Sequence, residues 1–245
     1  MKIIDQIIAA KAENRKLLAV LMDPDKLTLA EVEKNLKSLH ENPVDYLLVG
    51  GSEVEKGRTQ QLVNKLKKHS SIPVILFPGD YSQITSDADA LLFLNLISGR
   101  NPEYLINQQV KSVPLLEKST LEIIPTAYLL IDGGTETSVE RISNTAPMGL
   151  EDEEKIINTA IAGTYMGNQM IYLEAGSGAK NPIPGSVISR IAERTDVPVI
   201  VGGGIRSHEQ LTHAFENGAD MIVIGTALEN NPNLLGQILN NEHFH

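Results

Sequence analysis

Short apolar segments alternate with longer amphipathic segments along the whole chain. Eight of the apolar segments have the length of β-strands, and they cover residues 17–22, 46–49, 74–77, 90–94, 123–131, 170–173, 199–201 and 221–224. Most are continuous apolar runs, which is typical of strands that a parallel sheet buries on both faces. Strands of this kind that alternate with amphipathic helices predict an α/β fold. The length of 245 residues fits a single (β/α)8 TIM barrel over residues 1–245.

Residues that favour helix termini lie between the predicted strands. Thr28 and Ser207 are each followed three residues later by Glu or Gln, which is the capping-box pattern of a helix N-terminus. Asn101 precedes Pro102, and this pair offers an N-cap followed by a proline at the first helical position. Gly218 fits the left-handed residue that often ends a helix.

One predicted connection is too short for a crossover helix. The segment GDYSQITSD, about nine residues long, joins the third strand to the fourth. A complete helical crossover between parallel strands needs roughly ten residues or more. We therefore predict that the third helix is degenerate or missing.

Composition and charge narrow the possible functions. The chain has no cysteine, which excludes disulfides, thiolate zinc sites and a cysteine nucleophile. Its formal net charge of −10, without a basic stripe, makes nucleic acid a poor partner. Charges interrupt the N-terminal segment, and no apolar run has the length of a membrane span. We therefore expect a cytoplasmic protein without stable membrane insertion.

Glycine-rich segments follow the last two predicted strands. Gly202, Gly203 and Gly204 follow the seventh strand, and Gly225 with Thr226 follows the eighth. In a (β/α)8 barrel, these two loops and the adjacent helix N-terminus commonly bind phosphate through backbone N–H groups. A tight turn is the alternative interpretation. The pattern favours a phosphate site without identifying a reaction, because many barrels share it.

Acidic and hydroxyl side chains follow the first two strands, at the end of the barrel where active sites lie. Asp23 and Asp25 follow the first strand, and Ser52 follows the second. Magnesium is commonly held by one or two protein oxygens together with substrate phosphates and water. These residues therefore predict a magnesium site at Asp23 and Ser52. For Asp25, a local role as a helix N-cap is an equally good interpretation.

Glu174 directly follows the apolar sixth strand and precedes a run of small residues. Burying a carboxylate at this position costs desolvation free energy, so its presence there indicates a functional role. The small residues after it leave space for a ligand, so Glu174 is a candidate for catalysis or for binding a substrate hydroxyl. The structural alternative is an ion pair with Lys180 or Arg206.

Six segments of the chain resemble the geranylgeranylglyceryl phosphate synthase family. They are LMDPDK from Leu21, VGGS from Val49, IPTAYLLIDGG from Ile124, YLEAGSGA from Tyr172, VGGGIRS from Val201 and ADMIVIGTALE from Ala219. The last two are common among phosphate-binding barrels, whereas DPDK followed by YLEAGSG is specific. IPTAYLLIDGG resembles the longer of the two main branches of the family, which includes archaeal and some bacterial members.

The resemblance implies roles for particular residues. Asp23 and Ser52 match the magnesium-binding positions of the family. The positions that bind sn-glycerol 1-phosphate match Tyr172, Leu173, Glu174, Ala175, Gly176, Ser177, Gly178, Gly203, Gly204, Gly225 and Thr226. Family members lack a regular third helix, in agreement with the short connection, and they form dimers or hexamers. A lipid product further implies transient contact with a membrane surface.

The implied reaction is Mg²⁺-dependent prenyl transfer. The 3-hydroxyl of sn-glycerol 1-phosphate attacks C1 of geranylgeranyl diphosphate, and pyrophosphate is released. The product is an ether-lipid precursor. Glu174 would accept or orient the attacking hydroxyl, and Asp25 would help to orient the diphosphate or metal-bound water. The alternatives are a different prenyl length, a phosphosugar isomerase or cyclase on the same barrel, and a non-catalytic phosphate- or lipid-binding scaffold.

One position departs from the shorter bacterial branch of the family. That branch has a phosphate-contacting lysine two residues before the metal-binding aspartate, where this chain has Leu21. The departure argues against membership of that branch and against its preference for very long prenyl chains. Phe77, Phe93 and Tyr104 are candidates for the side chain that limits prenyl length.

Overall fold

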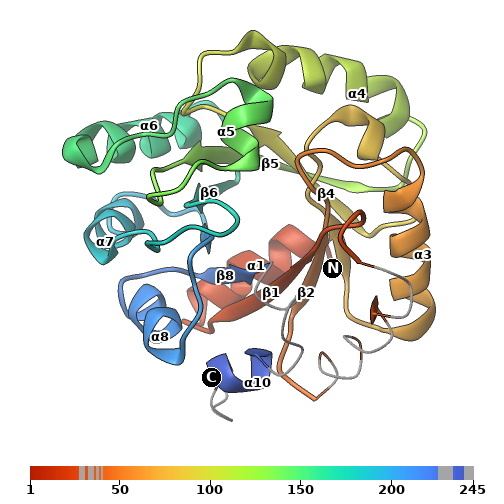
Figure 1. Ribbon diagram of the computed structural model, residues 1–245, viewed down its shortest axis with the longest axis horizontal. Helices are drawn as coiled ribbons and strands as arrows, with labels where there is room; N and C mark the ends of the chain where they lie inside the picture. The colour runs from red at the N-terminus through yellow and green to blue at the C-terminus, as the bar shows by residue number, and fades with distance from the viewer. Residues whose placement is uncertain (28–30, 33–35, 37–38, 40, 226–233, 240–245) are drawn as a thin grey trace.

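Eight parallel strands close into a barrel in the computed structural model (Figure 1). Each strand pairs with the next one along the chain, and β8 pairs with β1. The strands are β1 (Leu17–Met22), β2 (Tyr46–Val49), β3 (Val74–Leu76), β4 (Ala90–Asn95), β5 (Glu122–Leu130), β6 (Met170–Glu174), β7 (Val199–Gly202) and β8 (Met221–Ile224). The predicted fold and all eight predicted strands are confirmed, with differences of one residue at several ends.

Helices surround this barrel on the outside (Figure 1). The α-helices described are α1 (Ile3–Ala12), α3 (Arg58–His69), α4 (Gln108–Leu116), α5 (Ser138–Ser143), α6 (Glu153–Tyr165), α7 (Gly185–Ala192), α8 (His208–Glu216) and α10 (Leu234–Leu239). A π-helical turn, η2 (Glu103–Asn107), precedes α4, and a 3₁₀ turn, η3 (Leu150–Asp152), precedes α6. The structure describes residues 1–27, 31–32, 36, 39, 41–225 and 234–239.

The connection between β3 and β4 contains a single 3₁₀ turn, η1 (Tyr81–Gln83), in place of an α-helix. The side chain of Asp80 starts this turn by accepting a hydrogen bond from the Ser82 N–H at 2.6 Å. The prediction of a degenerate third helix is therefore confirmed. Its physical reason is chain length, because the connection cannot accommodate a full helical crossover.

The helix termini follow the sequence signals where the structure describes them. The Ser207 hydroxyl accepts a hydrogen bond from the Gln210 N–H at 3.2 Å, and the Asn101 side chain accepts one from the Glu103 N–H at 3.0 Å. Gly218 follows α8 with φ of +101°. The predicted cap at Thr28 lies outside the described residues.

Alternate residues of each strand face two different cores. In β6, Met170 and Tyr172 face the barrel interior, whereas Ile171 and Leu173 pack in the outer core beneath the helices. This alternation follows from the pleat of a β-strand. Both sets are apolar, which explains why the strands read as continuous hydrophobic runs.

Helix α1 closes the amino-terminal end of the barrel. Its N-terminal backbone donates from Ile3 and Ile4 to the carboxylate of Glu122, the first residue of β5, at 2.5 and 2.9 Å. Near its other end, Lys11 forms an ion pair of 2.9 Å with Asp220, which immediately precedes β8. Ile7 is fully buried in the interior core. Because α1 covers this end, ligand access is left to the carboxyl ends of the strands.

Among the described residues, no helix is both long enough and apolar enough to cross a membrane.

Candidate active site

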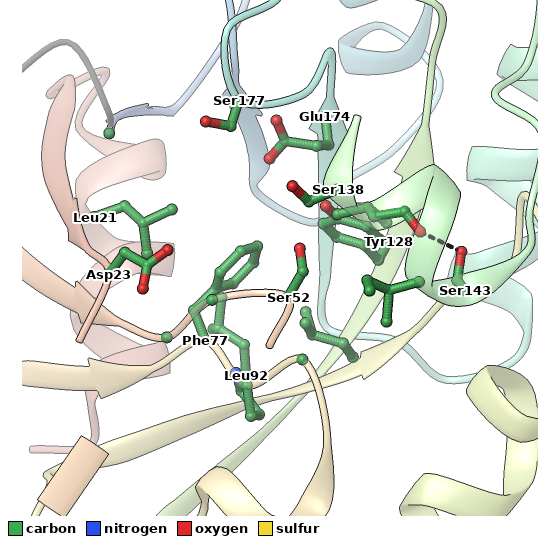
Figure 2. A pocket seen from close by; sticks show the side chains of 18 of the residues that line it. Leu21, Asp23, Ser52, Phe77, Leu92, Tyr128, Ser138, Ser143, Glu174 and Ser177 are labelled. Carbon is green, nitrogen blue, oxygen red and sulfur yellow. Dashed lines mark hydrogen bonds between the residues drawn. The ribbon is translucent and has the colours of Figure 1, made fainter. Parts of the chain in front are cut away.

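A cavity of about 660 Å³ opens at the carboxyl ends of the barrel strands (Figure 2). It brings together most of the predicted site residues. They come from the end of β6 and from the loops after β1, β2, β6, β7 and β8, and they are Asp23, Asp25, Ser52, Tyr172, Glu174, Gly176, Ser177, Gly178, Gly203, Gly204 and Gly225. Asp23 and Gly225, which are 202 positions apart in the sequence, thus share one cavity because all of these loops leave the same end of the barrel.

Two predicted site residues do not direct their side chains into the cavity. The side chains of Leu173 and Ala175 pack in the outer core, so these two residues can offer a ligand only their backbone groups. Their orientation follows from strand alternation, which directs the neighbouring Tyr172 and Glu174 inward. Thr226 lies outside the described residues.

Glu174 is the last residue of β6, and its side chain is directed into the cavity (Figure 2). The residue is only 6% exposed, and its carboxylate accepts a hydrogen bond from the Gly176 N–H at 2.7 Å. Burial raises the pKa of Glu174 to about 7, although the Gly176 N–H and the Tyr172 hydroxyl act in the opposite direction. A carboxyl group with this pKa can accept or release a proton near neutral pH.

The ion pairs considered for Glu174 are not present in the described structure. Arg206 instead donates to the carbonyl oxygens of Gly178 and Ala179, at 3.0 and 2.7 Å. It therefore holds the loop after β6 against the loop after β7. Lys180 is exposed, and its backbone N–H donates to the carbonyl of Gly133.

The loop after β6 and the glycine-rich loop after β7 lie in direct contact. Gly203 has φ of +81°, a conformation that favours glycine. A Cβ atom at this position would lie 2.6 Å from the Gly176 nitrogen and 2.8 Å from the Glu174 Oε1 atom. Only a residue without a side chain lets the loops come this close, and the space that remains beside Glu174 is bordered by backbone.

Asp23 and Ser52 both line the cavity, on either side of the Phe77 ring in Figure 2. The carboxylate of Asp23 lies against Gly51, the residue before Ser52, because a Cβ at Gly51 would be 3.0 Å from its oxygens. Asp23 also accepts the Asp25 N–H at 3.0 Å and pairs with Lys26 at 3.3 Å. One carboxylate and one hydroxyl are hard oxygen donors, which suit Mg²⁺ when a substrate phosphate completes the ligand set.

The described residues contain no cluster of three or more Asp, Glu, His or Cys side chains that would hold a metal ion by themselves.

Asp25 forms contacts between two loops. Its carboxylate accepts the Glu55 N–H at 2.9 Å and pairs with Arg58 at 3.4 Å. These contacts attach the loop after β1 to the loop after β2, which carries Ser52. They support a positioning role for Asp25 more directly than a contact with the reacting groups.

Helix α5 contributes cavity residues that the sequence analysis did not identify. Ser138 and Arg141 line the cavity, and Arg141 lies 4.0 Å from Glu53 of the β2 loop. The signal for this helix was present in the sequence, because Thr137 and Glu140 have capping-box spacing. The Thr137 hydroxyl accepts the Glu140 N–H at 3.0 Å.

An apolar arm extends the cavity beneath α5 and beside η2. It consists of Ile84, Leu92, Leu94, Tyr104, Val139 and Ile142. The Tyr104 hydroxyl donates to the Ile142 carbonyl at 3.3 Å, which connects η2 to α5. Phe77, Phe93 and Tyr104, the candidates for limiting prenyl length, all line the cavity.

Comparison with known proteins places these features in a family. A model of the PcrB family matches residues 10–241. A geranylgeranylglyceryl phosphate synthase of Zunongwangia profunda is 50% identical over 229 residues, which are 94% of this chain and 97% of the relative. One of Flavobacterium johnsoniae is 48% identical over 92% of this chain and 93% of the relative.

A solved structure agrees with the sequence comparison. The (S)-3-O-geranylgeranylglyceryl phosphate synthase of Thermoplasma acidophilum, in complex with sn-glycerol-1-phosphate, superposes with a TM-score of 0.91 at 32% identity. The match covers 97% of this chain and 96% of that one. Since the family model and these relatives span nearly the whole barrel, the chain belongs to the PcrB family.

Proposed function

We propose that this protein is a geranylgeranylglyceryl phosphate synthase. It joins the 3-hydroxyl of sn-glycerol 1-phosphate to C1 of geranylgeranyl diphosphate and releases pyrophosphate. The observation that carries the proposal is the position of Glu174, a buried carboxyl with a pKa raised to about 7. It lies in one cavity with the glycine-rich loops on one side and with Asp23 and Ser52 on the other (Figure 2).

The glycine-rich loops form the acceptor end. Backbone N–H groups around Gly203 and Gly225 bind the phosphate of glycerol phosphate, which fixes the distance from the phosphate to the reacting hydroxyl. Glu174 then lies beside that hydroxyl and accepts its proton as the new bond forms. The T. acidophilum relative, solved with sn-glycerol-1-phosphate, supports this assignment of the acceptor.

Asp23 and Ser52 form the diphosphate end. Their oxygens would hold Mg²⁺, which, when bound, neutralises the charge of the departing pyrophosphate. Asp25 keeps the two loops that carry them together through Glu55 and Arg58. Arg141 adds a positive charge at the mouth of the cavity, where its partner Glu53 is 4.0 Å away.

The apolar arm accommodates the prenyl chain. Its lining of aliphatic side chains and Tyr104 offers a hydrocarbon chain a route away from the polar end. An isomerase or cyclase acting on phosphosugars would have no use for such a lining. The arm therefore favours a prenyl substrate.

The test is pyrophosphate release by the purified protein with geranylgeranyl diphosphate and Mg²⁺. The acceptor is either sn-glycerol 1-phosphate or its 3-phosphate enantiomer. We expect turnover with the 1-phosphate alone, loss of turnover after chelation of the metal, and recovery when Mg²⁺ is restored. Asp23→Ala should lose activity, whereas Asp5→Ala, at an exposed position on α1, should retain it.

Failure to turn over with either acceptor and with shorter or longer prenyl diphosphates would contradict the proposal. Binding without pyrophosphate release would favour a scaffold, and isomerisation of a phosphosugar would favour the alternative enzyme class.

A further inference from the structure

The proposed reaction determines where the reacting carbon must lie. C1 of the prenyl diphosphate is bonded to an oxygen held at Asp23 and Ser52, and it is attacked by a hydroxyl beside Glu174. C1 must therefore lie between these two groups. Phe77 and Tyr128 both line the cavity, and Figure 2 shows the Phe77 side chain between Asp23 and Ser52, below Glu174 in that view.

Three aromatic rings form one cluster there. The Phe77 ring stacks on the Tyr172 ring with centroids 5.1 Å apart, and it lies 5.8 Å from the Tyr128 ring. The two tyrosine rings are 5.4 Å apart. Tyr128 and Tyr172 are buried, whereas Phe77 is partly exposed to the cavity. The cluster therefore presents the Phe77 ring to a ligand and supports it from behind.

The backbone of Phe77 is fixed as firmly as its ring. Its N–H donates to the Val49 carbonyl at 2.8 Å, at the end of β2. A Cβ atom on Gly50 would lie only 1.8 Å from the Phe77 carbonyl oxygen, so the two chain segments are in close contact. This contact leaves the ring little freedom to move away from the reacting carbon.

We infer that Phe77, supported by Tyr172 and Tyr128, stabilises positive charge on C1 during prenyl transfer. The C1–O bond breaks, and its electron pair leaves on the pyrophosphate oxygen. The glycerol oxygen donates an electron pair to C1, and its proton passes to Glu174. Between these events, C1 and C3 of the allylic chain carry positive charge, which the electron-rich face of an aromatic ring attracts.

The inference rests on the proposed function and makes Phe77 a catalytic residue. A desolvated cation–π contact contributes about 2 kcal/mol, which corresponds to roughly thirtyfold in rate. An aliphatic side chain would fill the same space and offer no such attraction.

The experiment replaces Phe77 with 4-fluoro-, 3,5-difluoro- and 3,4,5-trifluorophenylalanine, which nearly keep the shape of the ring and progressively withdraw electrons from its face. The bond-forming rate is measured in single-turnover experiments with geranylgeranyl diphosphate, sn-glycerol 1-phosphate and Mg²⁺. The same series at Phe215, which packs in the outer core on α8, is the matched control.

We expect the logarithm of the rate to fall with each fluorine at position 77, by roughly thirtyfold over the series, while KM for both substrates stays constant. The series at position 215 should be flat. A flat series at position 77, with an active wild-type protein, would overturn the inference and leave the proposed function intact. An inactive wild-type protein would instead be a failure of the proposed function. Phe77→Leu should lose as much rate as the trifluoro variant, with thermal melting to check that it folds.

Discussion

Individual residues of this barrel acquire their chemistry from burial. Glu174 is the clearest case, since the same carboxyl group in water would be ionised throughout the neutral range. Its position at the end of β6 removes it from solvent, and burial raises its pKa to about 7. The hydroxyl of Tyr172 has no hydrogen-bond partner of normal geometry among the described protein atoms. It is therefore available to a ligand oxygen or to Glu174 itself.

The raised pKa predicts the pH dependence of the reaction. Glu174 must be deprotonated to accept a proton, so kcat/KM should rise as pH increases through about 7. Glu174→Gln should lower kcat by about 10²- to 10⁴-fold and remove this acidic limb. Initial rates between pH 5 and pH 9 provide the measurement, and an unchanged acidic limb in the variant would contradict the assignment.

The raised pKa of Glu174 also predicts how folding stability depends on pH. Stability should fall as pH rises, whereas activity should rise. Between the ordinary pKa of 4.5 and the raised value of about 7, the folded protein retains a proton that the unfolded chain loses. Folding stability should therefore fall as pH rises across this window, by about 3 kcal/mol in total from this group. Glu174→Gln cannot lose this proton, so its melting temperature relative to wild type should increase from pH 4.5 to pH 7.5.

Secondary-structure elements determine which end of the barrel remains open. Helix α1 covers the amino-terminal end, and its attachment depends on Glu122, which accepts the N–H groups of both Ile3 and Ile4. A carboxylate at a helix N-terminus is further favoured by the helix dipole.

Removing this attachment should destabilise the protein without affecting catalysis directly. Glu122→Ala leaves two backbone N–H groups without their partner and should lower the free energy of unfolding by about 1–3 kcal/mol. Urea unfolding followed by circular dichroism measures the change. Glu117→Ala, in the turn after α4, is a suitable control because its side chain is exposed. Equal stability of the two variants would show that the cap is unimportant.

The whole molecule presents an apolar surface that the monomer does not cover. On η2 and α4, Ile106, Val110 and Val113 are 59%, 63% and 44% exposed, and their spacing of four and three residues places them on one helical face. Such a surface often marks a protein–protein contact. It is consistent with the dimer or hexamer that the family resemblance implies.

We predict that this surface takes part in the assembly of the protein. Light scattering on the eluting protein should give the mass of a dimer or hexamer, and Val110→Lys should shift it toward the monomer. Ile8→Lys, at an exposed apolar position on α1, is the matched control and should have no effect. A monomeric wild-type protein would contradict the prediction.

The sequence by itself determined the barrel and the location of the site. Continuous apolar strands, the short segment before β4 and the capping residues are local patterns, and each depends on residues close together in the chain. The glycines after β6 and β7, with Asp23, Ser52 and Glu174, were identifiable because every strand of a barrel ends on the same side. Residues that follow different strands are therefore expected to lie close together at that end of the barrel.

Only the tertiary structure decided how these residues are used. Arg206 was a possible partner for an anion, and it instead holds the loop that follows β6. The Asp25 carboxylate accepts a hydrogen bond from the Glu55 N–H, which joins the loop after β1 to the loop after β2. The pKa of Glu174 and the stacking of Phe77 on Tyr172 depend on burial and on contacts between distant strands. The physical reason is that desolvation and ring packing arise from side chains far apart in sequence, whose distances exist only once the barrel closes.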